Sequence, residues 1–178
     1  MKILEIGAGK KPVKISGGDE VIRLDKFSIE GVDVVHDLEV LPLPFKTGEF
    51  DVIHAHHVLE HVHKFFELMD EIYRILKPNG KLKCSVPHYS SNFAYVNPDH
   101  KRYFAYDSWK YFTDEIDENY YTKSRFKAKI RLNFVRAGIF TILNPIVNPI
   151  INLRPHFTEK FSPFAIDEIR AELIAIKQ

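Results

Sequence analysis

The stretch of sequence that decides the fold is Leu4-Glu5-Ile6-Gly7-Ala8-Gly9. The run from Lys2 to Ile6 is apolar and stops at glycine, which is typical of a buried strand followed by a tight backbone turn. Glycines at positions 7 and 9 let the backbone approach a ligand and present N–H groups to an anion. The stretch therefore predicts a strand that ends in a binding loop.

Three further short strands are predicted after this loop, and each ends in polar residues. They cover Glu20–Leu24, ending at Asp25; Val32–Val35, ending at His36-Asp37; and Phe50–Ile53, ending at His54-Ala55-His56-His57. In an open α/β sheet, ligands bind in the crevice outside the carboxyl ends of the parallel strands. We expect these polar residues to line the same edge of one sheet.

The clearest helix is predicted over Phe65–Leu76, because apolar residues recur there at helical spacing and charged residues fill the other face. Lys77-Pro78-Asn79-Gly80 ends it, since proline cannot continue a helix and Asn-Gly favours a turn. The other expected elements are a strand over Lys81–Val86, a short helix over Asp107–Phe112, a half-buried strand with one basic face over Phe126–Phe134, and a last strand over Ile166–Ile176.

The first connections of the predicted sheet are unusually short. About ten residues separate Gly9 from the second strand, whereas a crossover that contains a helix needs about a dozen. The same holds between Asp25 and Val32. We therefore expect the first crossover helices to be shortened, and one face of the sheet to be thinly covered near the binding loop.

Composition limits the class of protein. The chain has 178 residues, enough for one domain with a core, and 25 Lys+Arg nearly balance 24 Asp+Glu, which argues against non-specific nucleic-acid binding by the whole surface. Cys84 is the only cysteine, so an intrachain disulfide and a thiolate zinc cage are excluded. We expect one domain over residues 1–178, with a ligand-binding core over 1–113 and C-terminal strands over 114–178 that include an apolar excursion at 139–164.

Location follows from what the sequence lacks. The N-terminal run is broken too early by glycine to be a signal peptide, and no apolar run reaches the length of a membrane span. We expect a cytoplasmic protein.

Five features come in a fixed order along the chain, and each falls at a strand end or a helix stop. They are Leu4–Gly9, Asp25, Asp37, the stretch Phe50–Val62 with its Val58-Leu59-Glu60-His61-Val62, and Leu76–Gly80. Together they resemble the class I, Rossmann-like S-adenosylmethionine-dependent methyltransferases, specifically their small type 11-like members, over residues 1–113. The resemblance implies a three-layer α/β fold with a mostly parallel seven-stranded sheet and a last antiparallel strand.

The same resemblance implies S-adenosylmethionine as cofactor and S-adenosylhomocysteine as product. In the family the glycine loop meets the methionine carboxylate, and Asp25 would accept the ribose hydroxyls. Asp37 would take the adenine amino group, with Leu38 packing on the ring, and the backbone at His54 and Ala55 would meet the methionine ammonium. The expected cofactor-binding set is Glu5, Gly7, Ala8, Gly9, Asp25, Lys26, Asp37, Leu38, His54 and Ala55.

Two rival phosphate loops do not fit the sequence. A dinucleotide fingerprint needs glycine at position 12, which is Pro12, and a Walker loop needs Gly-Lys followed by Ser or Thr, where this chain has Gly9-Lys10-Lys11. NAD binding stays open as an alternative, because an acidic residue at Asp25 is compatible with it.

Residues for the methyl acceptor are expected beyond the fourth and fifth strands. Methyl transfer from a sulfonium is an in-line displacement, so the enzyme mainly aligns the nucleophile and excludes water, and a base helps only where the acceptor loses a proton. Histidines and tyrosines concentrate there, and one histidine would serve as base because imidazole titrates near neutral pH. The candidate catalytic residues are His57, His88, His100 and Tyr89, with Tyr103 shaping the pocket. The alternative is that most of these histidines cap, pack or face solvent.

Several questions stay open at this point. His57 and His61 would share one helix face, yet no His-Glu-x-x-His pattern accompanies them, and we expect no metal. The acceptor is expected to be a small molecule; a non-catalytic partner module on the same fold and an RNA or protein methyltransferase are the alternatives. The basic face over Arg125–Arg131 would bind an anionic acceptor or be solvated, and residues 139–164 would form a lid, core, or the contact of a homodimer.

Overall fold

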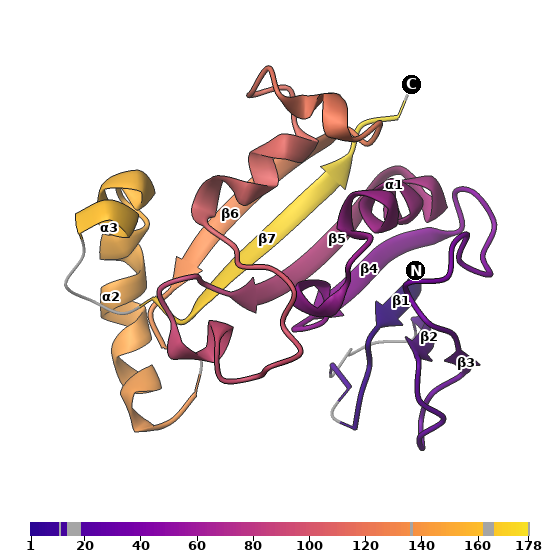
Figure 1. Ribbon diagram of the computed structural model, residues 1–178, viewed down its shortest axis with the longest axis horizontal. Coiled ribbons are helices and arrows are strands. Elements are labelled where there is room, and N and C mark those ends of the chain that lie inside the picture. The colour runs from indigo at the N-terminus through magenta and orange to yellow at the C-terminus, as the bar shows by residue number, and fades with distance from the viewer. Residues whose placement is uncertain (11, 14–18, 136, 162–165, 178) are drawn as a thin grey trace.

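A computed structural model describes residues 1–178 except 11, 14–18, 136, 162–165 and 178. The centre of the molecule is a twisted sheet of seven strands in the order β3-β2-β1-β4-β5-β7-β6. Figure 1 shows the sheet running from the short strands at the N-terminal side to β6 and β7.

Six strands run in one direction and the seventh, β7, runs against them, as expected for the fold. The parallel strands are β1 (Lys2–Ile6), β2 (Glu20–Asp25), β3 (Val34–Val35), β4 (Phe50–His56), β5 (Leu76–Pro87) and β6 (Phe126–Asn133). Strand β7 (Glu168–Ala175) lies between β5 and β6 and is antiparallel to both. The assignment of all residues to one domain stays a prediction.

Two strands extend beyond their expected bounds, while β3 and β7 each begin two residues later than expected. Strand β4 continues to His56 instead of ending at Ile53, because His54, Ala55 and His56 keep pairing with β5. Strand β5 already begins at Leu76, so Pro78 lies within the strand where a turn was predicted. Phe50 pairs with Leu76, and Val52 pairs next with Lys81, so the extra residues on β5 form an irregularity in the ladder.

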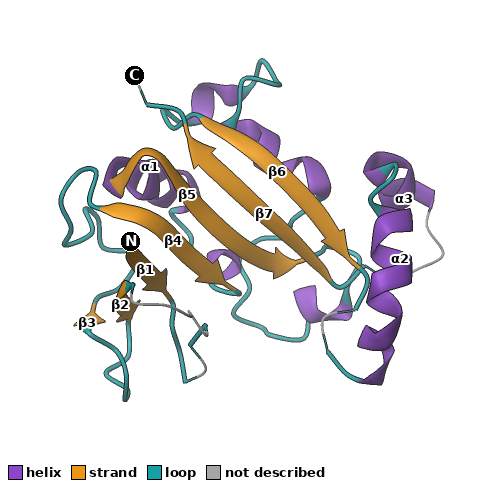
Figure 2. Ribbon diagram, turned by 180° about the vertical axis from the view of Figure 1, so that it is seen from behind, coloured by secondary structure: helices purple, strands orange, loops and turns teal. Residues whose placement is uncertain are grey.

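The helices gather on one side of the sheet. Helix α1 (Phe65–Ile75) ends just before the predicted stop, and the 3₁₀ segment η3 (Tyr106–Phe112) matches the predicted short helix. Figures 1 and 2 show both on the same face, whereas the opposite face, in front in Figure 2, has no helix of the described residues over it. The described residues between β1 and β4 contain no helix, so the shortening of the first crossovers extends to all three connections there.

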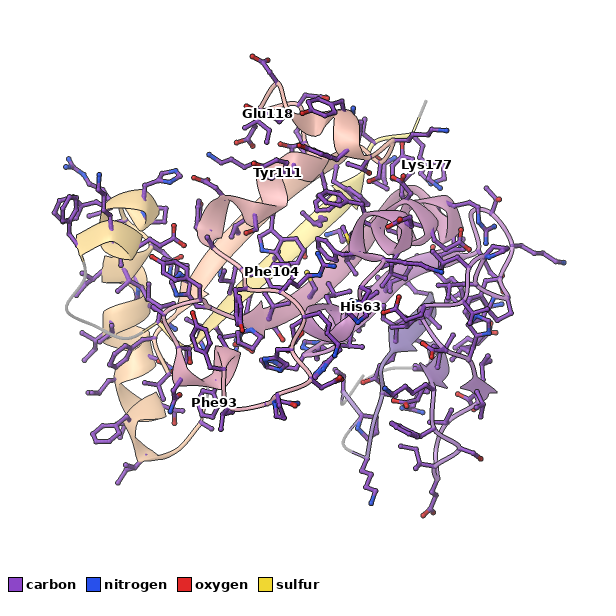
Figure 3. The ribbon with its side chains drawn as sticks, in the orientation of Figure 1. His63, Phe93, Phe104, Tyr111, Glu118 and Lys177 are labelled. Carbon is purple, nitrogen blue, oxygen red and sulfur yellow. The ribbon has the colours of Figure 1, made fainter. Side chains whose placement is uncertain are left out.

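Burial explains why the helical face forms the core. Phe65 of α1 and Trp109 and Phe112 of η3 are buried against the strands, and Phe104 stacks on Trp109 with ring centroids 5.4 Å apart. Figure 3 shows Phe104 over the middle of the sheet. The face without helices, which we call the open face, instead carries His54, Lys83, Lys129, Arg131 and Arg170 around a hollow of about 350 Å³.

The described part of the predicted apolar excursion, residues 139–161, is mostly helical, and 162–164 lie outside the described residues. It contains η5 (Ile139–Leu143), α2 (Asn144–Ile151) and α3 (Pro155–Phe161), which Figure 1 shows at the end of the molecule beside β6. Three shorter 3₁₀ segments, η1 (Leu59–His61), η2 (Asn92–Ala94) and η4 (Asn119–Tyr121), lie in other connections. Among the described residues, no helix is both long and apolar enough to cross a bilayer.

Candidate functional site

A cavity of about 870 Å³ lies where β1, β2, β3 and β4 end. Its volume is in the range of cavities that hold cofactors and small molecules. The wall is built from residues that directly follow each of these strands: Gly7, Gly9 and Lys10 after β1; Asp25 to Ile29 at and after β2; Asp37 to Glu39 after β3; and His57, Val58 and His61 to His63 after β4. Leu24, Asp99 and Lys101 complete it.

The glycine loop is shaped by close packing. Gly7 and Gly9 have φ values of +66° and +55°, a left-handed backbone that favours glycine. A Cβ at Gly7 would lie 2.7 Å from Val58 Cβ and closer still to one of its methyl carbons, so no side chain fits there. At Gly9 the nearest atom to an added Cβ would be 4.0 Å away. Gly7 is therefore fixed by both conformation and space, and Gly9 by conformation alone.

Asp25 is buried at the cavity and held in one orientation. Its Oδ2 accepts a hydrogen bond from Gly9 N at 2.9 Å, and its Oδ1 accepts one from Phe27 N at 2.9 Å. Each carboxylate oxygen has a further lone pair available, because an ionised carboxylate offers about four acceptor positions. Asp25 can therefore accept a pair of hydroxyls without losing the loop that it organises.

The N–H groups of the loop are used within the protein. Gly7 N and Ala8 N both donate to Leu24 O, at 2.8 and 3.3 Å, and Gly9 N donates to Asp25. The sequence led us to expect Gly7 and Gly9 to offer these groups to an anion. In the structure the cavity wall supplies positive charge through Lys10, Lys26 and Lys101 instead.

The structure brings together part of the expected cofactor set. Six of its members line the cavity: Gly7, Gly9, Asp25, Lys26, Asp37 and Leu38. Ala8 and Ala55 are buried beside it without lining it. Glu5 and His54 pair across β1 and β4 at positions that belong to the open face, so their side chains lie away from the cavity.

Burial on the open face shifts the pKa values of both Glu5 and His54. Burial raises the pKa of the Glu5 carboxyl, although Glu5 accepts a hydrogen bond from Val13 N at 2.6 Å and lies 3.4 Å from Arg23 Nε. Burial, with the nearby charges of His56 and Lys83, lowers the pKa of His54 to about 4. His54 is therefore neutral at physiological pH.

His57 lies in the cavity wall between two buried carboxylates. Its Nε2 is 3.1 Å from Glu168 Oε1, its Nδ1 is 3.3 Å from Glu60 Oε1, and its backbone has a φ of +49°. Burial by itself lowers the pKa of His57, but the hydrogen bonds to Glu168 and Glu60 outweigh it and raise the pKa to about 9. The pKa of Glu168 falls to about 2, because His57 and Arg170 outweigh its burial. At neutral pH this histidine is a cation.

A second histidine in the wall, His61, is held by a carboxylate. Its Nδ1 lies 3.1 Å from Asp99 Oδ2, and its ring meets the ring of His100 edge-on with centroids 4.7 Å apart. His100 bonds to Ala94 O through Nδ1 and lies behind the cavity wall, with Nε2 3.9 Å from Glu60. Ligand atoms of Glu60, His61 and His100 lie within 4.8 Å of one another. We assign no metal to them, because Glu60 Oε1 already faces His57 Nδ1 and His61 Nδ1 already faces Asp99 Oδ2.

The other two candidate catalytic residues lie at the start of the loop that follows β5. His88 is completely buried, with Nδ1 2.7 Å from Ser90 Oγ and Nε2 2.9 Å from Glu159 Oε1. The Tyr89 hydroxyl donates to Glu159 O at 3.2 Å. Neither residue lines the cavity, and both join this loop to α3.

Sequence reasoning missed the carboxylates around the histidines. Glu60 was part of a recognised stretch but was assigned no role, and Glu168 opens β7, more than one hundred residues further along the chain. Phe27, exposed beside Asp25 in the cavity, was also missed. The one sequence signal for these carboxylates was Glu60 itself, an acidic residue between a leucine and a histidine in Leu59-Glu60-His61.

Comparison with known proteins identifies the family to which the chain belongs. A family model described as a methyltransferase domain matches residues 1–130, which is most of the chain. Demethylmenaquinone methyltransferase from Listeria monocytogenes is 29% identical over 99 residues, which cover 50% of this chain and 40% of that protein. The chain therefore spans about two fifths of the length of such relatives.

Solved structures share the fold. A SAM-dependent methyltransferase from Archaeoglobus fulgidus superposes with a TM-score of 0.61 at 20% identity, over 97% of this chain and 85% of that one. The YcgJ protein from Bacillus subtilis superposes with a TM-score of 0.59 at 15% identity, over 99% and 92% of the two chains. The chain is therefore a member of the methyltransferase domain family and has the fold of the class I, S-adenosylmethionine-dependent enzymes.

Proposed function

We propose that this protein transfers the methyl group of S-adenosylmethionine to a small-molecule acceptor. The observation that carries the proposal is the cavity at the strand ends, in which the tight Gly7 turn, the oriented Asp25 and the acidic Asp37 share one wall. This arrangement fits a ligand that has hydroxyls, an amino-substituted ring and a charged amino-acid end.

Each part of the cavity suits one part of that ligand. The free lone pairs of Asp25 would accept the ribose hydroxyls, and Asp37, beside the buried Leu38, would accept from the adenine amino group. Lys10 and Lys26 would attract the carboxylate, in place of the N–H groups that the loop already uses. The bound cofactor would supply a methyl group on a positively charged sulfur.

The chain would contribute alignment and exclusion of water. His57 is protonated at neutral pH, so it would orient groups by donating hydrogen bonds and would not remove a proton. His61, fixed by Asp99 in the wall, is our added candidate for a base where the acceptor must lose a proton. His88, His100 and Tyr89 would support the acceptor side from behind the wall.

The acceptor itself is chosen by analogy. The Listeria relatives are demethylmenaquinone methyltransferases, so a demethylated quinone is the first acceptor to test. We place the protein in the cytoplasm as part of the same proposal.

Two measurements test the proposal in order. Isothermal titration should show binding of both S-adenosylmethionine and S-adenosylhomocysteine, and absence of binding of either at millimolar concentration would refute cofactor use. Transfer of a labelled methyl group across a panel of acceptors then separates an enzyme from a non-catalytic partner module. Binding without turnover on any acceptor would favour the module.

A second candidate function, methylation of RNA, is favoured by the open face. Lys83, Lys129, Arg131 and Arg170 surround its hollow, and Glu172 is the one acidic residue among the described residues that line it. Such a cluster would neutralise phosphates, and RNA binding would then weaken steeply with salt. A filter-binding series over increasing salt, with wild type and Lys129→Glu, would show this slope and its reduction. A flat, weak signal in both proteins would leave the small-molecule acceptor.

A further inference from the structure

Helix α2 has its polar side turned inward and its apolar side turned outward. Asn144, Asn148 and Asn152 recur every four residues and so share one helix face. On the opposite face, Ile146 and Ile150 are 65% and 62% exposed, and Leu153, two residues beyond the helix, is 80% exposed. A helix on the surface of a protein in water has the reverse arrangement, with its apolar stripe toward the core.

The inward asparagines have a structural role that fixes this orientation. Strand β6 is at the edge of the sheet, and its outer backbone groups need partners. Asn152 accepts from Leu132 N and donates to Leu132 O, at 2.8 and 2.7 Å, and Asn148 accepts from Phe134 N at 2.8 Å. Asn144 accepts from Val135 N and donates to Val135 O. The buried Ile151 adds an apolar anchor. The outward apolar face is therefore held rigidly in place.

The apolar surface extends over the neighbouring segments. Eight large apolar side chains between η5 and α3 are 61% to 82% exposed: Ile139, Phe140, Ile142, Ile146, Ile150, Leu153, Phe157 and Phe161. Figure 3 shows the side chains of α2 and α3 projecting from this end of the molecule, away from the sheet. Exposed apolar side chains in this number, gathered on neighbouring segments of the chain, mark a site of contact with a membrane or another protein.

Charge favours the membrane. Arg154 and Lys160 are exposed beside the apolar side chains. Among the described residues of 137–161, Glu159 is the only acidic one, and it is turned inward onto His88 and Tyr106 N. An apolar face with basic neighbours suits an anionic bilayer, whereas two copies meeting through this face would bring like charges together. We propose that η5, α2 and α3 form a surface that rests in the interface of a membrane rich in anionic lipid.

The test is co-sedimentation of the full chain with vesicles of mixed phosphatidylcholine and phosphatidylglycerol. The wild type should bind, and Ile146→Ser/Ile150→Ser should bind at least about tenfold more weakly, because two exposed apolar side chains are lost from the surface. The matched control, Val40→Ser/Ile176→Ser, changes two exposed apolar residues that follow β3 and β7, outside η5, α2 and α3, and should bind as wild type does. The thermal unfolding temperatures of the wild type and both variants should be equal, and this control shows that a loss of binding is not a loss of folding.

Three results would overturn the proposal. One is no binding of the wild type. Another is equal binding by the wild type and the Ile146/Ile150 variant. The third is a wild-type dimer in sedimentation velocity without vesicles that the Ile146/Ile150 variant loses, because this surface would then be the contact of a second copy. Preference for the anionic lipid is checked with Arg154→Glu/Lys160→Glu, which should reduce binding to mixed vesicles toward the level seen with phosphatidylcholine alone.

Discussion

Gly7 shows how one residue can set the position of a whole binding loop. Its left-handed φ and the contact with Val58 act together, whereas Gly9 has the conformational requirement alone. Because β1 and the segment after β4 touch at this point, the glycine also determines how closely the two halves of the cavity wall approach. The effects of conformation and space can be separated by comparing the two glycines.

We predict that Gly7→Ala destabilises the protein clearly more than Gly9→Ala. Each pays about 1–2 kcal/mol for a left-handed alanine, and Gly7→Ala adds about 1–3 kcal/mol of overpacking against Val58. Urea unfolding measures both. Adding Val58→Ala removes the methyl contacts but keeps the Cβ at 2.7 Å, so it should relieve part of the cost in the Gly7 variant and none in the Gly9 variant, a coupling that a double-mutant cycle reveals. Equal destabilisation of the two glycine variants would contradict the close contact.

Asp25 organises the loop and, by our proposal, binds the ribose. Replacing it with alanine removes acceptors for charge-assisted hydrogen bonds of about 1.5–3 kcal/mol each, so the affinity for S-adenosylhomocysteine should fall at least about tenfold. Asp33→Ala is the matched control, because Asp33 accepts from Arg23 N on the same strand but does not line the cavity. Isothermal titration compares the two, and an unchanged affinity in Asp25→Ala would remove this residue from the site.

The raised pKa of His57 makes the free energy of unfolding depend on pH. Its folded pKa of about 9 is raised from the ordinary 6.5, so its contribution is fully present below pH 6.5 and is lost as pH rises through about 9. The shift corresponds to at most about 3 kcal/mol. The partner carboxylate Glu168 has a pKa lowered from 4.5 to about 2. The stabilisation that this carboxylate contributes is therefore lost as the pH falls from about 4.5 toward 2.

Unfolding free energies of wild type and His57→Gln, measured between pH 6 and pH 10, test this directly. The difference between the two proteins should shrink as the pH passes about 9. A constant difference across the range would show that folding does not raise the pKa of this imidazole.

Helix α2 replaces a missing neighbour strand, and this gives a prediction about the edge of the sheet. Asn148→Ala removes the acceptor for Phe134 N and the donor to Asn133 Oδ1, and should cost about 1–3 kcal/mol because a part-buried amide just beyond β6 loses its hydrogen bond to Asn148. Hydrogen exchange at Phe134 N should become faster. Ile150→Ala, on the exposed side of the same helix, should change neither quantity. Slow exchange retained in Asn148→Ala would contradict the bridging role.

Elements with one regular hydrophobic pattern could be predicted from the sequence. Features that depend on pairing with a neighbouring strand or helix could not. Helix α1 has a regular apolar stripe, and its predicted range fits within one residue. His54 was placed at a strand end, but cross-strand pairing with β5 extends β4 and turns His54 to the open face. Pro78 was interpreted as part of a turn, although it lies at the irregular start of β5. The repeated Asn-Pro of α2 left several interpretations, because its partner is the edge of β6.

At the scale of the molecule, the helices cover one face of the sheet, and this face holds the core. Three surfaces are then available for binding: the cavity at the strand ends, the open face and the exposed side of α2. The cavity wall is assembled from four short segments, each of which follows a different strand. A ligand bound there would link β1, β2, β3 and β4, whose connections contain no helix of the described residues.

Cofactor binding should therefore stabilise the whole fold. A ligand at one hundred times its Kd stabilises the folded state by about 2.7 kcal/mol, which for a chain of this size raises the Tm by about 5–10 °C. We expect this rise with S-adenosylhomocysteine in a thermal unfolding experiment, and a much smaller one for Asp25→Ala at the same ligand concentration. NAD at that concentration serves as the control ligand and should leave the Tm unchanged, because position 12 is proline and the loop N–H groups are already bonded within the protein. A rise with NAD and none with S-adenosylhomocysteine would assign the cavity to a dinucleotide.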